Sequence, residues 1–209
     1  MILVVISKET REPVCFIKEY SYCSYTEEYC GRGSFEIHLE TNDESLPYLV
    51  FGNYVYLDYH NFLNTDGSKI VISVVGIIKT VKNSETSDFE VIVSGYLSNH
   101  LLEYRSCLTT YKYTSNISAI SSNIIYQLMQ NPSDGKRKMF NGINWSYYNH
   151  YKTSPTTIIR YQNTGDTILD CLRELFMPYN YGFFIELPIR TYVASGSQGI
   201  KILAVYVHR

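Results

Sequence analysis

The sequence predicts a β-rich α+β fold, with a β module over residues 1–97 and an α+β module over residues 98–182. Short apolar or alternating runs separated by turn residues fill the first module. Two stripes of apolar residues at helical spacing follow, within residues 115–131 and 166–177. The runs GFFIEL and GIKILAVYV then predict two final strands. Strands in residues 183–209 are therefore candidates to complete the first module.

Alternation and turn residues identify the strands of the first module. ILVVI is a short apolar strand, and EPVCFIKEY follows a charged turn. In SFEIHLE, three apolar residues alternate with Glu36, His38 and Glu40, which is typical of a half-buried strand with one solvated face. YLVFGNYVYLDY contains a glycine that indicates a bulge or turn, and IVISVVGIIKTVKN and DFEVIVSGYL are further strands. Asp66-Gly67 predicts a hairpin turn, and the whole pattern favours a barrel or a sandwich.

Helical patterns begin at residue 98. Ser98 or Asn99 can cap a short helix, and a second helix over residues 115–131 ends before Pro132. MFNGINWSYYNHYK and TTIIRYQ predict strands or irregular β structure. Asp166 is the expected cap of a third helix, DTILDCLRELFM. The apolar stripe of that helix consists of Ile168, Leu169, Leu172, Leu175 and Phe176.

Composition argues against several classes of function. The chain has 209 residues, of which 45% are hydrophobic, so it is not disordered in composition. With 18 basic and 20 acidic residues, it lacks the bulk charge that binds nucleic acid or an acidic membrane. No segment approaches the roughly 18 apolar residues of a membrane span. The N-terminal apolar run lacks a basic flank and predicts a strand, so we expect the protein to stay in the cytoplasm or leave it by lysis.

No motif predicts catalysis, a cofactor or a metal site. The five cysteines include no CxxC pair and no zinc-finger spacing with histidine, so we expect reduced and mostly buried thiols. His38 is expected to be solvated between two glutamates. His100 with Cys107 would need a third group to act as a nucleophile pair, and Asp166 serves better as a cap. We therefore predict that the protein is not an enzyme.

The stretch VIVSGYLSNHLLEYRSC passes from a strand through a glycine into a helix. It lacks the second glycine of an esterase elbow and the lysine and further glycines of a phosphate-binding loop. We interpret it as a structural corner. Gly95 allows a sharp exit from the strand, Leu97, Leu101 and Leu102 bury the corner, and Arg105 binds helix carbonyls or an acid. Gly95→Val is expected to lower stability.

Tyrosine is unusually abundant, with 21 residues. Codon bias can explain this, and so can an aromatic interaction surface, because tyrosine is enriched at interfaces. The aromatic run Trp145, Tyr147, Tyr148 and Tyr151 is a possible interaction surface. It could be a ligand platform, a subunit contact or one side of the core. The residues by themselves predict an interaction or structural protein.

The order of four features resembles the N-terminal region of tail-hub proteins of long-tailed bacteriophages, also called tail-associated or baseplate hub proteins. The first feature is GSFEIHLE followed by LVFGNYVYLD, and the second is the corner VIVSGYLSNHLLEYR. The third is IIRYQ, which contains Arg160, and the fourth is NTGDTILDCL leading into YNYGFFIEL. Together these features cover most of the chain.

This resemblance implies a β-barrel-like hub module with an α+β module inserted into it or following it. It also implies a homotrimeric ring at the virion tail tip, assembled in the host cytoplasm of a phage or prophage. The implied partners are the distal tail protein, tail tube or tape-measure protein on one side and a fibre or spike protein on the other. Catalysis, membrane binding and specific nucleic-acid binding are not implied. Full hubs carry further β modules, so a short homologue or a truncated chain is expected. The alternative is a β-rich carbohydrate- or receptor-binding module that uses Trp145 and its neighbours.

Overall fold

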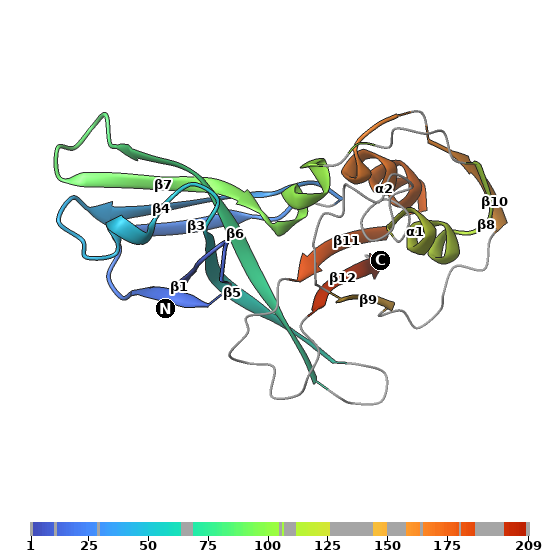
Figure 1. Cartoon of the computed structure of the whole chain (residues 1–209), viewed down its shortest axis with the longest axis horizontal. Helices are drawn as coiled ribbons and strands as arrows, with labels where there is room; N and C mark the ends of the chain where they lie inside the picture. The colour runs from blue at the N-terminus through green and yellow to red at the C-terminus, as the bar shows by residue number, and fades with distance from the viewer. Residues whose placement is uncertain are drawn as a thin grey trace. The chain divides into compact units, whose positions relative to one another are not determined.

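The computed structural model describes residues 2–10, 12–28, 30–63, 69–104, 106, 112–125, 144–149, 158–163, 165–179, 181–186 and 199–207. The chain divides into two compact units (Figure 1). The first unit contains residues 1–28, 32–98 and 186–198, and the second contains residues 29–31, 99–185 and 199–209. The short segment around Cys30 therefore belongs with the second unit, which no local sequence pattern indicated.

Seven strands of the first unit form one sheet. They are β1 (Leu3–Ile6), β2 (Pro13–Ile17), β3 (Tyr22–Thr26), β4 (Ser34–Glu40), β5 (Tyr54–Leu63), β6 (Lys69–Asn83) and β7 (Glu90–Leu97). Their order is β2-β1-β5-β6-β7-β4-β3, and each neighbouring pair is antiparallel. The β-rich prediction is confirmed. The described sheet is open, with β2 and β3 as its edges, so the β-barrel-like module that the resemblance implied is present as a large antiparallel sheet that does not close.

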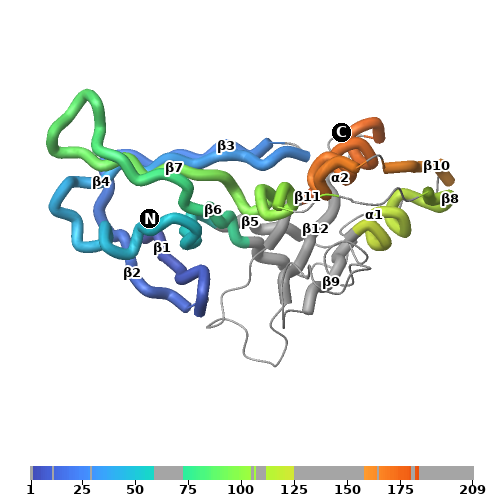
Figure 2. Tube along the Cα trace, turned by 45° about the horizontal axis from the view of Figure 1, so that its top comes forward, coloured from blue at the N-terminus to red at the C-terminus, as the bar shows by residue number. Residues whose placement is uncertain are grey.

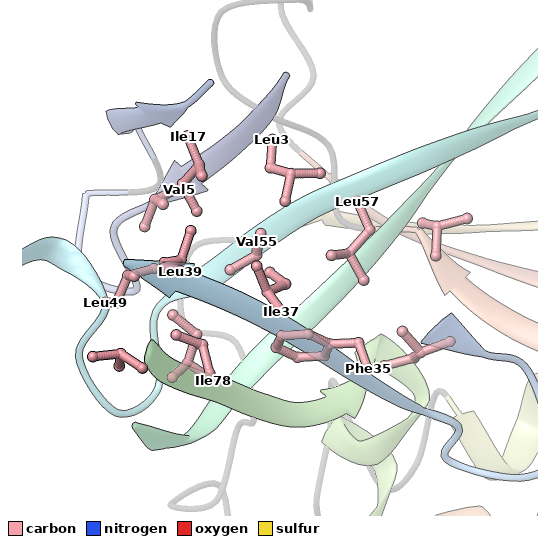
Figure 3. Packing of buried hydrophobic residues seen from close by; sticks show 14 residues of the cluster. Leu3, Val5, Ile17, Phe35, Ile37, Leu39, Leu49, Val55, Leu57 and Ile78 are labelled. Carbon is pink, nitrogen blue, oxygen red and sulfur yellow. The ribbon is translucent and has the colours of Figure 1, made fainter. Parts of the chain in front are cut away.

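The sheet buries one of its faces against itself. Side chains from both ends of the strand order enter one apolar cluster, in which Leu3 and Ile17 meet Ile37 and Leu39 (Figure 3). A hydrogen bond of 2.9 Å from the Tyr25 hydroxyl to the Asp58 carboxylate joins β3 to β5, although these strands are not neighbours in the sheet. Such contacts require the sheet to coil around its concave face, as a right-handed twisted sheet does.

The ring of Phe35 lies where side chains at two glycines would otherwise be. A Cβ at Gly76 would lie 2.5 Å from Cδ1 and Cε1 of this ring. A Cβ at Gly95 would overlap the backbone carbonyl of Ile77 and lie 2.8 Å from Cε1 of Phe35. Gly95 lies inside β7 opposite Phe35, beside a register shift between Ile78 and Thr80. The strand does not leave the sheet at Gly95, so the glycine is needed for close backbone approach rather than for a sharp exit.

Several local expectations are confirmed and one strand is additional. In β4, Phe35, Ile37 and Leu39 are buried, as the alternation predicts. Gly52 has φ of 87° and ends a turn after the 3-10 helix η1 (Leu46–Tyr48). Strands β5 and β6 pair as far as Leu63 and Lys69, while the predicted hairpin turn at residues 64–68 lies outside the described residues. Strand β3 was not expected, because YCSYT has no apolar alternation.

The second unit combines helices with two small sheets. The 3-10 helix η2 (Ser98–Tyr104) leads into it, and β8 (Lys112–Asn116) pairs with β10 (Ile158–Gln162) beside α1 (Ile117–Ile125) and α2 (Ile168–Phe176) (Figure 2). After the 3-10 helix η4 (Met177–Tyr179), the second sheet has the order β11-β12-β9. Its strands are β9 (Asn144–Asn149), β11 (Tyr181–Glu186) and β12 (Gly199–Val207). The last two strands therefore pair with each other, and β12 also pairs with β9.

Caps determine where the two α-helices begin. Thr167, not Asp166, caps α2, because its hydroxyl oxygen accepts the Asp170 backbone N–H at 3.1 Å. The same hydroxyl donates to the Asp170 carboxylate at 2.6 Å. The Asn116 side chain accepts the Ala119 backbone N–H at 2.8 Å, so α1 starts after β8 rather than at residue 115. The apolar stripe predicted for α2 is buried.

The two glycines near Phe35 differ in what a Cβ would meet. At Gly76 the nearest atoms are those of the Phe35 ring, and at Gly95 the nearest atom belongs to the Ile77 backbone. We expect Gly76→Ala and Gly95→Ala each to lower the free energy of unfolding by about 2 kcal/mol, and Gly95→Val by more. In a Phe35→Leu background, the effect of Gly76→Ala should shrink because only the ring is in its way. The effect of Gly95→Ala should persist because the Ile77 backbone remains. Urea denaturation of the double-mutant cycle measures this, with Ser94→Ala as the neighbouring control.

Candidate interaction surfaces

The predicted corner is divided between the two units. Leu97 belongs to the first unit, where it is buried against Gly33 and its backbone N–H donates to the Arg32 carbonyl at 3.1 Å. Leu101 and Leu102 are buried residues of the second unit. Arg105 lies outside the described residues. The predicted burial of the leucines is present, and the role of Arg105 stays a prediction.

The predicted aromatic run lies largely in β9. Trp145, Tyr147 and Tyr148 are residues of this edge strand, which pairs in parallel with β12 and places Trp145 opposite Ile200. Their side chains and the whole of Tyr151 lie outside the described residues. The role of the run as an interaction surface therefore stays a prediction.

A buried asparagine connects three distant segments of the second unit. The Asn99 amide donates to the Gly31 carbonyl at 2.9 Å and to the Phe183 carbonyl at 3.1 Å. Next to Gly31, Cys30 has φ of 58°, a left-handed conformation that is unfavourable for a residue with a Cβ. Burial raises the pKa of the Cys30 thiol to about 11. The sequence showed Asn99 only as a possible helix cap, and nothing local revealed these partners.

One end of the first unit exposes apolar side chains on connected loops. We call loops 41–53 and 84–89 the loop end. Phe51 is 64% exposed and Phe89 is 79% exposed, and Tyr48 and Val50 are also exposed. The Thr41 backbone N–H donates to the Phe89 carbonyl at 3.1 Å and so joins the two loops. Exposed apolar side chains on joined loops are available for contact with a protein partner.

Polar contacts hold the loop end in one conformation. The Asn53 side chain accepts the Lys8 backbone N–H at 3.1 Å and donates to the Tyr48 carbonyl at 2.9 Å. The Lys8 ammonium donates to the Phe51 carbonyl at 3.2 Å, and the Lys79 ammonium lies 5.1 Å from the centre of the Phe51 ring. These contacts restrain the loop around Phe51 and place two cations beside it, and such restraint reduces the entropy lost on association.

The open sheet supplies a second apolar surface at edge strand β2. Val14 and Phe16 of β2 are exposed, and so is Ile2 next to β1. The strand sequence PVCFI carries no charge, and charges are a common protection of sheet edges. Its free side is therefore suited to contact with another polypeptide.

The outer face of the sheet has a polar character. A groove of about 400 Å³ crosses β3, β4, β7 and β6, and hydroxyl side chains such as Ser24, Ser94 and Thr80 line much of it. Farther along β4, His38 is not simply solvated as expected. It lies between the carboxylates of Glu36 and Glu90. The sequence could show Glu36 beside it but not Glu90, which arrives from β7.

The described thiols and imidazoles show no arrangement suited to nucleophilic catalysis. Cys15, Cys23, Cys30 and Cys171 carry thiols rather than disulfides. Burial raises the pKa of the first three thiols, which disfavours the reactive thiolate. His100 pairs with Glu103 at 2.8 Å, and Cys107 lies outside the described residues. That the protein is not an enzyme stays a prediction.

Among the described residues, no group of three or more His, Cys, Asp or Glu side chains is arranged to hold a metal ion. No described helix is long and apolar enough to span a membrane.

Comparison with known proteins identifies a fold relationship. No protein-family model and no curated protein matches the chain. The solved structure of prophage tail protein gp18 from Listeria monocytogenes EGD-e matches with a TM-score of 0.55 at 10% identity, over 97% of this chain and 50% of that one. The chain therefore shares the fold of about half of this prophage tail protein.

Two other solved structures match less well. The tail protein from Neisseria meningitidis MC58 has a TM-score of 0.49 at 10% identity, over 96% of this chain and 49% of that one. The E. coli c3393 protein, a type VI secretion component with structural similarity to T4 tail proteins gp27 and gp5, has a TM-score of 0.46 at 15% identity. That match covers 87% of this chain and 44% of the other. The chain spans about half the length of the structures it matches.

The contacts of Asn99 predict a large effect from a nearly isosteric change. Asn99→Asp removes both amide donors and places a carboxylate against two carbonyl oxygens, so we expect a loss of about 3 kcal/mol in unfolding free energy. Asn42→Asp, which adds the same charge at an exposed position, should change stability by less than about 0.5 kcal/mol. Mass-spectrometric mapping of thiol labelling should also show faster modification of Cys30 in Asn99→Asp. Equal stability of the two variants would contradict the role of Asn99.

Proposed function

We propose that the protein is a structural component of a phage or prophage tail tip, where it forms a hub ring between the tail tube and a fibre or spike. The observation that carries this proposal is the fold match to the Listeria prophage tail protein along 97% of the chain. A fold alone hosts many functions, so the surfaces of the protein must also suit the role. The order of sequence features that resembles tail hubs gives independent support.

The exposed surfaces of the first unit suit assembly into a ring. In a cyclic ring larger than a dimer, each copy uses two different surfaces, one for each neighbour. The loop end and the outer side of β2 are two such surfaces with exposed apolar side chains. A homotrimer formed through them is the assembly that we propose. The lysines beside Phe51 would face an acidic or carbonyl-rich surface on the neighbour.

The other partners and the location follow from the same proposal. The distal tail protein, tail tube or tape-measure protein would bind on one side of the ring, and a fibre or spike protein on the other. The protein would assemble in the host cytoplasm and reside in the virion tail tip. The net charge of −2 is compatible with a ring that DNA passes without binding tightly.

A concentration series of solution mass, measured by light scattering on a sizing column, tests self-association. We expect the wild-type chain to shift from monomer to trimer as concentration rises. Phe51→Glu should weaken the trimer at least tenfold, because it places a charge in the apolar centre of the loop end. Ile158→Glu changes an equally exposed residue of the second unit and should leave the mass unchanged.

Each outcome of this experiment bears on the proposal. A strict monomer at every concentration would contradict self-association through this chain. A trimer that tolerates Phe51→Glu would support the ring but would exclude the loop end as its interface. Electron microscopy of tails labelled on this protein would then test the tail-tip location directly.

A further inference from the structure

His38 connects three strands at one edge of the sheet. It lies on the outer face of β4, where the strand register places it opposite Tyr22 in edge strand β3 and opposite Ile92 in β7. The rings of Tyr22 and His38 pack edge to face with their centres 5.0 Å apart. The imidazole is 20% exposed, so its neighbours shield it partly from water.

Both nitrogen atoms of the imidazole face carboxylates. Nε2 lies 2.9 Å from Oε1 of Glu36, and Nδ1 lies 3.1 Å from Oε1 of Glu90. A carboxylate accepts hydrogen bonds, so both contacts need an N–H donor. A neutral imidazole has only one N–H, whereas the imidazolium has two. Only protonated His38 can make both contacts at once.

The contacts extend to the segment that begins β3. The Ser21 hydroxyl donates to Oε1 of Glu90 at 3.0 Å and also lies 3.3 Å from the His38 carbonyl, while the Ser21 backbone N–H donates to that carbonyl at 3.0 Å. Glu90 therefore interacts with β4 through His38 and with the start of β3 through Ser21. Loss of either contact would loosen the attachment of the edge strand.

The charged groups around His38 favour its protonated form. On β4, Glu36 and Glu40 lie on the same face as His38, and Glu40 is opposite Glu90 of β7. From β3, the titratable group that faces the imidazole is Tyr22. From β6, Lys82 is opposite Ile92 and supplies the positive charge in this row. Three carboxylates thus share this face with one imidazole and one ammonium.

We propose that His38 is a pH-dependent clamp that holds edge strand β3 onto β4 and β7 when its imidazole is protonated. Loss of the proton leaves one of the two carboxylates without its donor and weakens the link through Glu90 and Ser21. The sheet then keeps its other six strands, while β3 opens more often. The pH of the surroundings thereby controls how firmly this edge of the sheet is closed.

The pKa directions agree with this geometry and define the pH window. The hydrogen bond with Glu36 is the main cause that raises the pKa of His38 above 6.5, with a further contribution from Glu90. The stabilisation from His38 is therefore complete below pH 6.5 and is lost as pH rises through the raised pKa. The Ser21 hydroxyl, and then His38, lower the pKa of Glu90 below 4.5. Its contribution is present above pH 4.5 and is lost as pH falls through the lowered value, so the clamp is strongest between these limits.

Hydrogen exchange of the β3 amides, corrected for the intrinsic pH dependence of exchange, measures the clamp. We expect the opening equilibrium of residues 22–26 to increase about tenfold between pH 5.5 and pH 8.5, the effect of losing one charge-assisted hydrogen bond. His38→Gln cannot become protonated, so its β3 opening should not change across this range. His100→Gln removes another histidine paired with a glutamate and should retain the wild-type response.

The other edge strand provides an internal control. Amides of β2 should show no comparable pH response, because β2 lies at the opposite edge of the sheet. The proposal would be overturned if β2 and β3 opened equally with pH, or if His38→Gln kept the full response of β3. Glu90→Gln gives a second test should His38→Gln fold poorly, and it too should remove the response.

Discussion

The close approach of strands β6 and β7 beneath the ring of Phe35 is the constraint on which the first unit depends. Among the described residues of this unit, the sheet buries its concave face against itself, because the apolar cluster draws on strands from both ends of the strand order. Coiling of that kind needs a place where backbones come closer than side chains normally allow. In this sheet the close approach is made possible by the missing Cβ atoms at Gly76 and Gly95. The register shift between Ile78 and Thr80 lies at the same position. A flat sheet would leave Leu3 and Ile17 unable to reach Leu39.

The same coiling explains why the unit is suited to assembly. A sheet that curves but does not close keeps two edges, and one of them, β2, exposes Phe16. The loops at one end expose Phe51, whose carbonyl accepts a hydrogen bond from Lys8, and Asn53 joins the same loop to the Lys8 backbone. Stability therefore comes from the concave face, and the edges and loops are left for partners. The proposed ring would use these edges and loops as its contacts.

Sequence reasoning was most successful where neighbours along the chain decide the outcome. Alternation in SFEIHLE correctly predicted the buried face of β4, and the apolar stripe of α2 is buried as expected. It was less successful where two local choices have similar energies. Thr167 and Asp166 are both good caps, and only the helix start shows that Thr167 is used. Gly95 was expected to be a glycine so that the chain could leave the strand sharply. In the structure, the reason is that a Cβ at this position would overlap the backbone carbonyl of Ile77 on another strand.

The sequence by itself determined the β-rich class, the buried apolar stripe of α2 and the turn at Gly52. Only the tertiary structure decided the strand order, the open edge at β3, the contact of His38 with Glu90 and the two carbonyl partners of Asn99. The physical reason is the range of the interactions. Periodicity reports which face of an element avoids water, and this depends on residues a few positions apart. Strand pairing and buried hydrogen bonds depend on the free energy of the whole sheet, which no short segment contains.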